Sequence, residues 1–266
     1  VTQKVFSLVS NHSDFKKTPN RDRLISALLK TNKNKLTIKE IVSISGVSSA
    51  VIAAAARTGI LNEELIPRDS PYPILNPDFK PKKLSPSQID VCEKIKDLQN
   101  QNNFSAILLQ GVTGSGKTEV YLEAVADALR KGEQILVLLP EIALTSEFFN
   151  RVKNRFGENP AEWHSGVTLA ERRRVWKMVA SGGAKLVIGA RSALFLPFMN
   201  LGLVIVDEEH DHSYKQEDGV IYNARDMAVL RSSIERSTVI LASATPSLES
   251  WVNAKNGKYS HVQIHK

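Results

Sequence analysis

The segment Gly111–Thr118, which reads Gly-Val-Thr-Gly-Ser-Gly-Lys-Thr, constrains the fold of this chain more than any other feature. It follows the apolar run 104–110 and precedes a helix-forming stretch, Lys117–Arg130. It therefore fits the order of strand, G-x-x-x-x-G-K-[ST] loop and helix that binds the phosphates of a nucleotide. This context makes a simple glycine-rich turn a poor explanation of the segment.

Each position in this loop has a chemical reason. The glycines let backbone amides close around phosphate oxygens, and the following helix N-terminus adds partial positive charge. Lys117 would neutralise the β- and γ-phosphates of ATP, and the Thr118 hydroxyl would ligate Mg²⁺. The residues predicted to bind the nucleotide here are Gly111, Val112, Thr113, Gly114, Ser115, Gly116, Lys117 and Thr118.

Strand-like and helix-like segments alternate through the last two thirds of the chain. Continuous apolar strands that alternate with helices are typical of a parallel sheet covered on both faces, so the predicted fold class is α/β. The predicted strands are 104–110, 135–139, 185–189, 202–206 and 238–242. The predicted helices are Lys117–Arg130, Ser146–Phe156 and Leu169–Ala180.

A second group of chemical residues follows the apolar run 203–206. Asp207 would emerge at the carboxyl end of this strand and hold Mg²⁺, and Glu208 would polarise the attacking water. Together with Lys117 and His210 they form the predicted catalytic set. A zinc or iron site made by Asp207, Glu208, His210 and His212 is an alternative, but it lacks the His-x-x-x-His or Cys spacing of such sites.

A run of small residues, Ser243-Ala-Thr-Pro-Ser247, follows the last predicted strand. We expect Ser243 and Thr245 to hydrogen-bond the acidic cluster and to sense its state. Without that cluster the run would be an ordinary turn.

The first third of the chain carries all of the excess positive charge. Residues 1–83 hold 14 Lys and Arg against 7 Asp and Glu, whereas residues 84–266 hold 21 of each. This asymmetry favours a module that faces nucleic acid beside a neutral module. A solvated basic surface is the equally weighted alternative.

The basic third reads as a small helical module. Helices are expected at Arg21–Lys30, from the Thr37–Glu40 capping box to Ser45, and from Ser48 or Ser49 to Arg57, with a short strand over 60–66. This order is typical of a winged helix. Only Arg57 on the third helix could reach a base, which argues against sequence-specific readout. The predicted domains are 1–65, a proline-rich linker 66–83, and 84–266.

Composition excludes several other classes of protein. The one cysteine, Cys92, excludes internal disulfides and cysteine-based zinc sites and fits a reducing, cytoplasmic setting. No apolar run approaches the ~18 residues of a membrane span, and residues 1–13 show no secretory signal. The absence of a starting methionine suggests a fragment.

The motifs, in order, resemble a known helicase family. The GKT loop, Pro140–Thr145, Gly189–Ala193, Asp-Glu-Glu-His and Ser-Ala-Thr follow the order of the first RecA-like lobe of superfamily-2 helicases. The stretches Val-Thr-Gly-Ser-Gly-Lys-Thr-Glu-Val-Tyr and Asp-Glu-Glu-His-Asp-His-Ser-Tyr-Lys-Gln-Glu-Asp-Gly closely resemble the primosomal replication-restart helicases. The likeness is strong over 84–266 and weak before it.

The resemblance implies an ATP-dependent 3′→5′ DNA helicase that acts at stalled forks to restart replication. It implies branched and single-stranded DNA, primosome proteins and single-strand-binding proteins as partners, and no membrane. Gln88 would read adenine, although Ser85-Pro-Ser-Gln88 is also a capping box. Tyr214, in the aromatic-rich loop 211–226, would stack on a base. The residues that the resemblance assigns to DNA binding or coupling are Glu141, Thr145, Arg191, Ser192, Tyr214, Lys215, Tyr222, Ser243 and Thr245.

Other features of the helicase family that this chain resembles limit the activity that we expect of it. Trp163, His164, Arg172 and Trp176 fall where the family has similar residues, but core packing explains the tryptophans at least as well. The family carries a cysteine-rich zinc element and a second lobe with an arginine finger, which this chain lacks, so we expect nucleotide binding with weak hydrolysis. The alternatives are a DNA-binding scaffold or regulator whose loop only senses ATP, and a restriction- or chromatin-type translocase.

Overall fold

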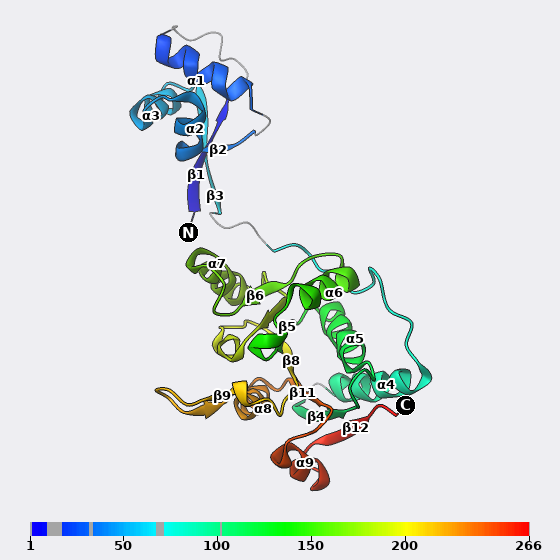
Figure 1. The fold of residues 1–266 in the computed structure, drawn as a ribbon. Helices are drawn as coiled ribbons and strands as arrows, with labels where there is room; N and C mark the ends of the chain where they lie inside the picture. The colour runs from blue at the N-terminus through cyan, green and yellow to red at the C-terminus, as the bar shows by residue number, and fades with distance from the viewer. Residues whose placement is uncertain (1, 10–17, 32–33, 68–71, 102, 266) are drawn as a thin grey trace. The chain divides into compact units, whose positions relative to one another are not determined.

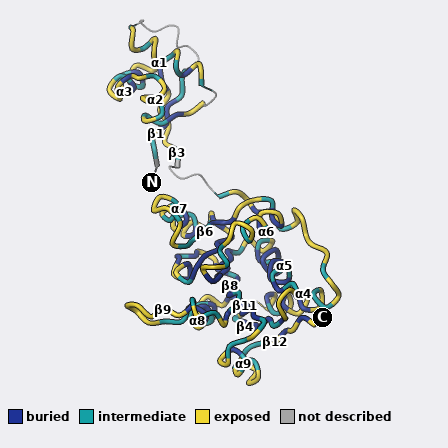
Figure 2. Tube along the Cα trace, viewed as in Figure 1, coloured by how far each residue is buried: buried dark blue, intermediate teal, exposed yellow. Residues whose placement is uncertain are grey.

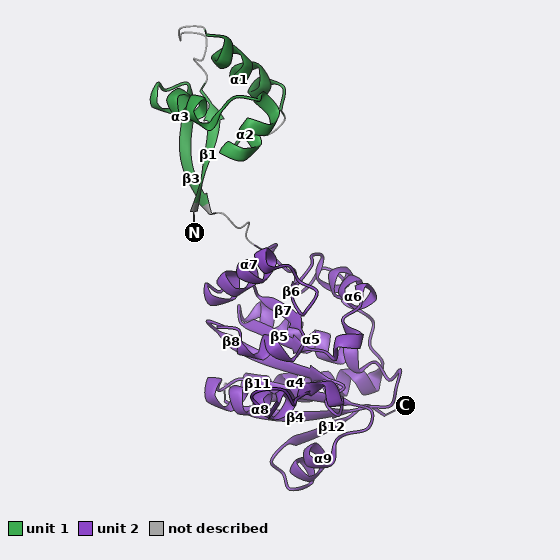
Figure 3. Ribbon diagram, turned by 60° about the vertical axis from the view of Figure 1, so that its left-hand side comes forward, with its two compact units in different colours: residues 1–70 green, residues 71–266 purple. Residues whose placement is uncertain are grey.

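The computed structural model describes residues 2–9, 18–31, 34–67, 72–101 and 103–265. The chain divides into two compact units, Val1–Ser70 and Pro71–Lys266, which Figure 3 shows in green and purple. Each unit has a hydrophobic core of its own.

Among its described residues, the first unit joins three helices to a small antiparallel sheet in the order β2-β1-β3. Its helix α2 begins at the predicted capping box, where Thr37 Oγ1 accepts from the Glu40 amide and the Glu40 carboxylate accepts from the Thr37 amide. Gly46 ends this helix with a φ of 67°, a conformation that favours glycine. The elements are β1 (Thr2–Leu8), α1 (Pro19–Leu29), β2 (Leu36–Thr37), α2 (Ile38–Ser45), α3 (Ser49–Arg57) and β3 (Leu61–Pro67).

Strand β1 is an element that the sequence analysis does not predict. It pairs with β3 along its whole length, from Thr2 opposite Pro67 to Leu8 opposite Leu61. It also supplies the buried side chains of Val5 and Phe6. Polar residues flank Val5 and Phe6, so the sequence shows no apolar run that would predict this strand. The strand forms by pairing with β3, about sixty positions away in the chain.

The second unit is a parallel sheet whose described strands run in the order β12-β4-β11-β8-β5-β7-β6. All of its neighbouring pairs are parallel, which confirms the predicted class. The strands are β4 (Ser105–Gln110), β5 (Gln134–Leu138), β6 (Ala161–Trp163), β7 (Leu186–Gly189), β8 (Leu201–Asp207), β11 (Thr238–Ser243) and β12 (Ser260–Gln263). A two-stranded hairpin, β9 (Lys215–Gln216) and β10 (Tyr222–Asn223), stands apart from the sheet.

Helices cover both faces of this sheet (Figure 1). Alternate strand residues point to opposite faces, so Ile107 joins the core under α4, α5 and α6, whereas Leu108 joins the core under α7 and α8. Figure 2 shows that the strands are the most deeply buried part of the unit. The helices are α4 (Pro86–Asn100), α5 (Lys117–Arg130), α6 (Ser146–Phe156), α7 (Leu169–Ala180), α8 (Ala224–Glu235) and α9 (Leu248–Lys255).

Part of the segment interpreted as a linker packs on the second unit. Residues 72–83 lie along α5 and α6, where the Asn76 amide donates to Phe156 O at 2.9 Å and Arg155 Nη1 donates to Pro77 O at 2.7 Å. Lys82 pairs with Glu119 at 2.9 Å. The prolines do exclude a helix here, but ion pairs and a buried Leu75 hold the extended chain in place. Residues 68–71 of the predicted linker lie outside the described residues.

In the part of the chain that the structure describes, no single helix is long and apolar enough to cross a membrane. The bent pair α2 and α3 reaches that length and composition only when the two helices are taken together.

Candidate nucleotide-binding and catalytic site

The loop between β4 and α5 has the geometry of a phosphate cradle. Gly114 and Gly116 adopt φ values of 77° and 85°, where side chains are disfavoured. A Cβ on Gly116 would lie 2.2 Å from Gln88 Nε2, so a side chain there would displace Gln88 from the loop. Helix α5 begins directly after Gly116 without a side-chain cap, which leaves its first amides for an anion.

Two side chains in this cradle fit a phosphate ligand. Lys117 is only 8% exposed, and its Nζ donates to Gly111 O at 2.9 Å across the loop. Ser115 Oγ is buried and has no hydrogen-bond partner among the described residues. A buried hydroxyl without a partner is costly unless a ligand satisfies it. The residues present therefore fit a nucleotide phosphate.

Gln88 connects the cradle to the start of α4. Its side-chain oxygen accepts from the Ser85 amide at 2.8 Å, and the Ser85 hydroxyl accepts from the Gln88 amide, so the predicted capping box is confirmed. Its Nε2 donates to Ser115 O at 2.9 Å. Gln88 therefore lies against the loop while it caps the helix, and an adenine-reading role stays a prediction.

Asp207 lies at the carboxyl end of β8, close to α5. Tyr121, which is fully buried, donates its hydroxyl to Asp207 Oδ2 at 2.9 Å. Burial raises the pKa of Asp207, and the Tyr121 hydrogen bond and the nearby Lys117 only partly offset that effect. Tyr121 is a site residue that the sequence analysis misses, although it lies four residues after Lys117 and so on the same helix face.

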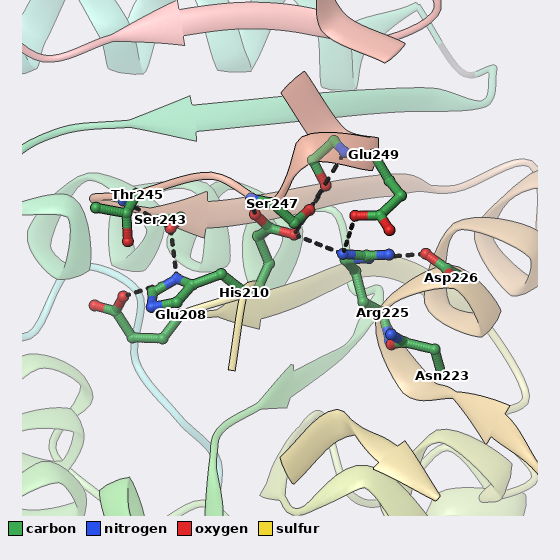
Figure 4. A network of polar contacts seen from close by, with 11 residues as sticks. Glu208, His210, Asn223, Arg225, Asp226, Ser243, Thr245, Ser247 and Glu249 are labelled. Atoms are coloured by element: carbon green, nitrogen blue, oxygen red, sulfur yellow. Dashed lines mark hydrogen bonds and ion pairs between the residues drawn. The ribbon is translucent and has the colours of Figure 1, made fainter. Parts of the chain in front are cut away.

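The residues after Asp207 are held in an unusual backbone. Glu208 adopts a φ of 47°, which is rare for a residue with a side chain and is common at functional sites. Its amide donates to Asp207 Oδ1 at 3.0 Å. His210 Nδ1 lies 3.7 Å from the Glu208 carboxylate, so the two predicted catalytic side chains face each other (Figure 4).

Ser243 joins the acidic strand end to the phosphate loop. Its Oγ lies 2.7 Å from His210 Nδ1 and accepts from the Thr245 amide at 3.0 Å. Its carbonyl accepts from the Gly111 amide at 3.2 Å. The structure thus brings together the three motifs at one edge of the sheet, where the carboxyl ends of β4, β8 and β11 meet.

Thr118 and Asp207 are the side chains that would hold Mg²⁺. A hydroxyl and a carboxylate supply oxygen ligands, which this ion prefers. Among the described ranges, no group of three His, Cys, Asp or Glu side chains is placed to hold a metal. The alternative of a zinc or iron site at Asp207, Glu208, His210 and His212 therefore has no support in those ranges.

Tyr214 does not lie where a base could stack on it. Its side chain is 1% exposed, and its hydroxyl oxygen lies 2.6 Å from Asp207 O and 3.0 Å from Leu138 O. The prediction of a stacking role is wrong for this conformation, because the ring fills the core under β5 and β8. Tyr214 instead anchors the start of the loop to the backbone of the catalytic strand.

Three of the other residues predicted to face DNA lie around this loop or next to its contacts. Arg191, in the 3-10 helix η3 (Arg191–Phe195), donates to the carbonyls of Ser213 and Lys215 at 3.1 and 2.7 Å and so braces the loop. Ser192 Oγ accepts from Trp163 Nε1 at 3.2 Å. The ring of Tyr222 meets that of Phe195 edge to face at 5.2 Å.

Two of the predicted DNA-facing residues flank the start of α6. Glu141 is exposed in the 3-10 helix η2 (Glu141–Ala143). Thr145 caps α6 by accepting from the Phe148 amide at 3.3 Å. Lys215 is exposed and pairs with Glu217 at 2.8 Å.

The residues that the resemblance groups around Trp163 are divided between core and surface. Trp163 is half-buried, and Arg172 lies over its ring and donates to His164 O at 2.8 Å. Trp176, in contrast, is 48% exposed. Core packing therefore explains Trp163 but not Trp176.

Comparison with protein families identifies the fold and its motifs. Residues 85–253 match the DEAD/DEAH box helicase family, which is more than half of the chain. The chain belongs to the DEAD/DEAH box helicase family. Membership implies the use of ATP and Mg²⁺, in agreement with the cradle and with Asp207. The matched range includes the Asp-Glu-Glu-His segment at 207–210.

Curated relatives of this DEAD/DEAH box helicase are named Replication restart protein PriA. The protein from Rickettsia felis is 52% identical over 62% of this chain and 25% of its own length. That from Bacillus subtilis is 40% identical over 86% of this chain and 29% of its own. The protein from Chlamydia muridarum is 39% identical over 93% of this chain and 33% of its own. The chain spans about a quarter to a third of the length of these relatives.

A solved structure of another protein supports the same fold for this lobe. RecG bound to a three-way DNA junction superposes with a TM-score of 0.54 at 26% identity, covering 70% of this chain and 24% of RecG. The covered part confirms a RecA-like α/β lobe.

Proposed function

We propose that this chain is the ATP-binding lobe, with an attached DNA-facing module, of an ATP-dependent 3′→5′ DNA helicase that restarts replication at stalled forks. The observation that carries the proposal is the meeting of Lys117, Asp207 and Ser243 at one sheet edge, in a sequence similar to replication restart proteins. Single-stranded and branched DNA, primosome proteins and single-strand-binding proteins are the proposed partners, and the cytoplasm is the proposed location.

The site residues have different roles in ATP hydrolysis. Lys117 and the first amides of α5 bind the phosphates, and Gln88 is proposed to read adenine. Mg²⁺, when bound by Thr118 and Asp207, would neutralise phosphate charge. Glu208 accepts a proton from the attacking water. His210 contacts both this carboxylate and Ser243, so it connects the protonation of Glu208 to Ser243.

The DNA side of the proposal uses the residues around the loop. Glu141, Thr145, Arg191 and Ser192 are proposed to face single-stranded DNA, with Lys215 and Tyr222 on the hairpin β9–β10. Thr245 completes the coupling turn through its amide bond to Ser243. Residues 1–65 are proposed to be a winged-helix module that contacts the DNA backbone, in keeping with their excess of Lys and Arg.

A pair of variants in the full-length protein tests the proposal. Lys117→Ala should abolish ATP hydrolysis and leave fork DNA binding largely intact, because Lys117 serves phosphate alone. Glu208→Gln should keep nucleotide affinity while turnover falls about 10²-fold or more, the scale of a lost general base. ATPase rates and DNA anisotropy are the measurements.

The outcomes separate the alternatives. A wild-type protein without DNA-stimulated ATPase activity would favour the scaffold that only senses ATP. Equal loss of DNA binding in Lys117→Ala would contradict the division of labour. Near-normal turnover in Glu208→Gln would remove the role of that carboxylate.

A further inference from the structure

Glu209, which lies between the two catalytic side chains of its motif, is a buried carboxylate with no role in the proposed chemistry. Its side chain is fully buried, and its amide donates to Ala242 O at 3.1 Å. Burying a carboxylate is costly unless hydrogen bonds or a cation satisfy it. The partners of Glu209 therefore indicate what it holds in place.

One set of partners lies in the turn that follows β11. Glu209 Oε1 accepts from the Ser247 amide at 2.7 Å, and Oε2 accepts from the Ser247 hydroxyl at 2.9 Å. Oε2 also accepts from the Ser250 hydroxyl at 2.8 Å, in the first turn of α9. Negative charge is favourable at this positive helix end. His210 holds Ser243 at one end of the turn 243–247 (Figure 4), and Glu209 holds Ser247 at the other end.

The other partner is Arg225, which lies where the aromatic-rich loop returns to the core. The side chain of Arg225 is 7% exposed, and its Nη1 lies 3.5 Å from Glu209 Oε2. Its amide donates to Asn223 Oδ1, the N-cap of α8, whose first turn closes the 211–226 loop. Glu209 thus precedes the loop by two residues, and Arg225 follows its last hairpin residue, Asn223, by two.

We propose that Glu209 is a positioning residue that, through Arg225, connects the aromatic-rich loop to the Ser243–Ser247 turn and to Glu208. The strained backbone at Glu208 needs fixed neighbours, and Glu209 supplies one through both its amide and its carboxylate. A shift of the loop on a DNA strand moves Arg225, and this movement reaches the turn through the buried carboxylate of Glu209. The inference rests on the proposed function, since it concerns ATP hydrolysis stimulated by DNA.

The test uses the full-length protein and begins with the wild type. DNA-stimulated ATPase activity in the wild type must be present, and its absence would refute the proposed function rather than this inference alone. Glu209→Gln keeps the shape and one acceptor but removes the charge that faces Arg225. Its kcat at saturating single-stranded DNA should fall by about tenfold, the effect of a lost charged hydrogen bond. Its KM for ATP and its Kd for DNA should stay within about twofold of wild type.

The chain offers a matched control for this variant. Glu249 lies at the same 3.5 Å from Arg225 Nη1, but its side chain is 69% exposed. Glu249→Gln should therefore keep wild-type kcat and wild-type stimulation. A Glu209→Gln protein with wild-type stimulation, or a Glu249→Gln protein that loses as much, would overturn the inference.

A second variant covers the case in which Glu209→Gln does not fold. Arg225→Gln leaves the bonds between Glu209 and the turn and breaks the link to the loop. It should lower the ratio of stimulated to basal ATPase rate by several-fold, about the effect of one ion pair, with the basal rate retained more than the stimulated rate. An unchanged ratio would overturn the inference. A fall of both rates by the same factor, together with a higher KM for ATP, would also overturn it.

Discussion

Tyr214 shows how burial changes the meaning of a single residue. A base-stacking role would let the basal ATPase rate survive Tyr214→Ala, whereas the buried position predicts that it does not. Removing the ring leaves a core cavity that costs about 3–5 kcal/mol, and the Asp207 carbonyl loses its donor. We expect lower unfolding free energy and a lower rate both with and without DNA. Urea unfolding and ATPase assays of the full-length protein check this.

Two further variants sharpen the Tyr214 test. Tyr214→Phe keeps the ring and should recover most of the stability, so any remaining loss of rate belongs to the hydroxyl. Tyr222→Ala changes a half-exposed ring on the hairpin and should spare the basal rate. A basal rate that is normal in Tyr214→Ala would contradict the anchoring role.

The sequence predicts residues whose chemistry depends on local order better than residues whose chemistry depends on distant partners. The roles of Lys117 and Asp207 are predicted from a loop motif and from the end of an apolar strand, which are both visible in the sequence. The partner of Tyr214 at Leu138 lies 76 positions away, so the burial of an aromatic ring in a polar loop is not visible in the sequence. Tyr121 is hidden for the same reason, because its partner Asp207 lies 86 positions away.

At the scale of elements, one carboxylate near the phosphate loop helps to hold the segment 72–83. Glu119 follows Thr118 directly and pairs with Lys82 and with Arg151 through the same oxygen. Burial alone would raise the pKa of Glu119, but the hydrogen bonds from Arg151 and Lys82 outweigh it and hold the pKa below its usual value. These two ion pairs therefore join the connecting segment and α6 to the first turn of α5.

This lowered pKa makes a prediction about stability and pH. A carboxyl group whose folded pKa is depressed stabilises the fold above its unfolded pKa and loses that contribution as pH falls through the folded value. Glu119→Gln should therefore lower the unfolding free energy by about 1 kcal/mol at pH 7, and the difference should shrink below about pH 4. Urea unfolding followed by tryptophan fluorescence at both pH values measures it.

The matched control for Glu119 is another paired glutamate. Lys215 also lowers the pKa of Glu217, but this pair is exposed and joins no separate elements. Glu217→Gln should leave stability unchanged at both pH values. A difference for Glu119→Gln that persists undiminished at low pH would show that packing, not charge, is lost.

Elements with strong local signals are predicted well, and short edge strands are not. The predicted helices 117–130, 146–156 and 169–180 have the observed bounds, and each predicted strand of the parallel sheet lies within one residue of the observed one. Strands β6 and β12 are missed because they are short, carry polar residues and gain their place by pairing with β7 and β4.

At the scale of the whole molecule, the two units should unfold separately. The first unit has its own core of residues such as Leu24, Ile41 and Ile52. The second is built around the parallel sheet, with the core residues Ile107 and Leu108 on its two faces. Separate cores joined by a short chain favour separate transitions.

The aromatic residues make these transitions separable by spectroscopy. All three tryptophans and all five tyrosines of the chain lie in the second unit. Tryptophan fluorescence therefore follows the second unit alone, whereas far-UV circular dichroism follows the helices of both. The 266-residue chain should give two midpoints by circular dichroism and only one of them by fluorescence.

Nucleotide should move only one of these two midpoints. ATP with Mg²⁺ at about 100 times its Kd adds about 2.7 kcal/mol to the folded state that binds it, which is roughly 5–10 °C for a unit of this size. The fluorescence midpoint should rise by that amount, and the second midpoint seen by circular dichroism should stay fixed, because the first unit lacks a phosphate loop among its described residues. In Lys117→Ala the fluorescence midpoint should no longer respond to nucleotide. A single transition that rises as a whole with ATP would instead mean that the two units fold as one, and that nucleotide binding is coupled directly to the basic module.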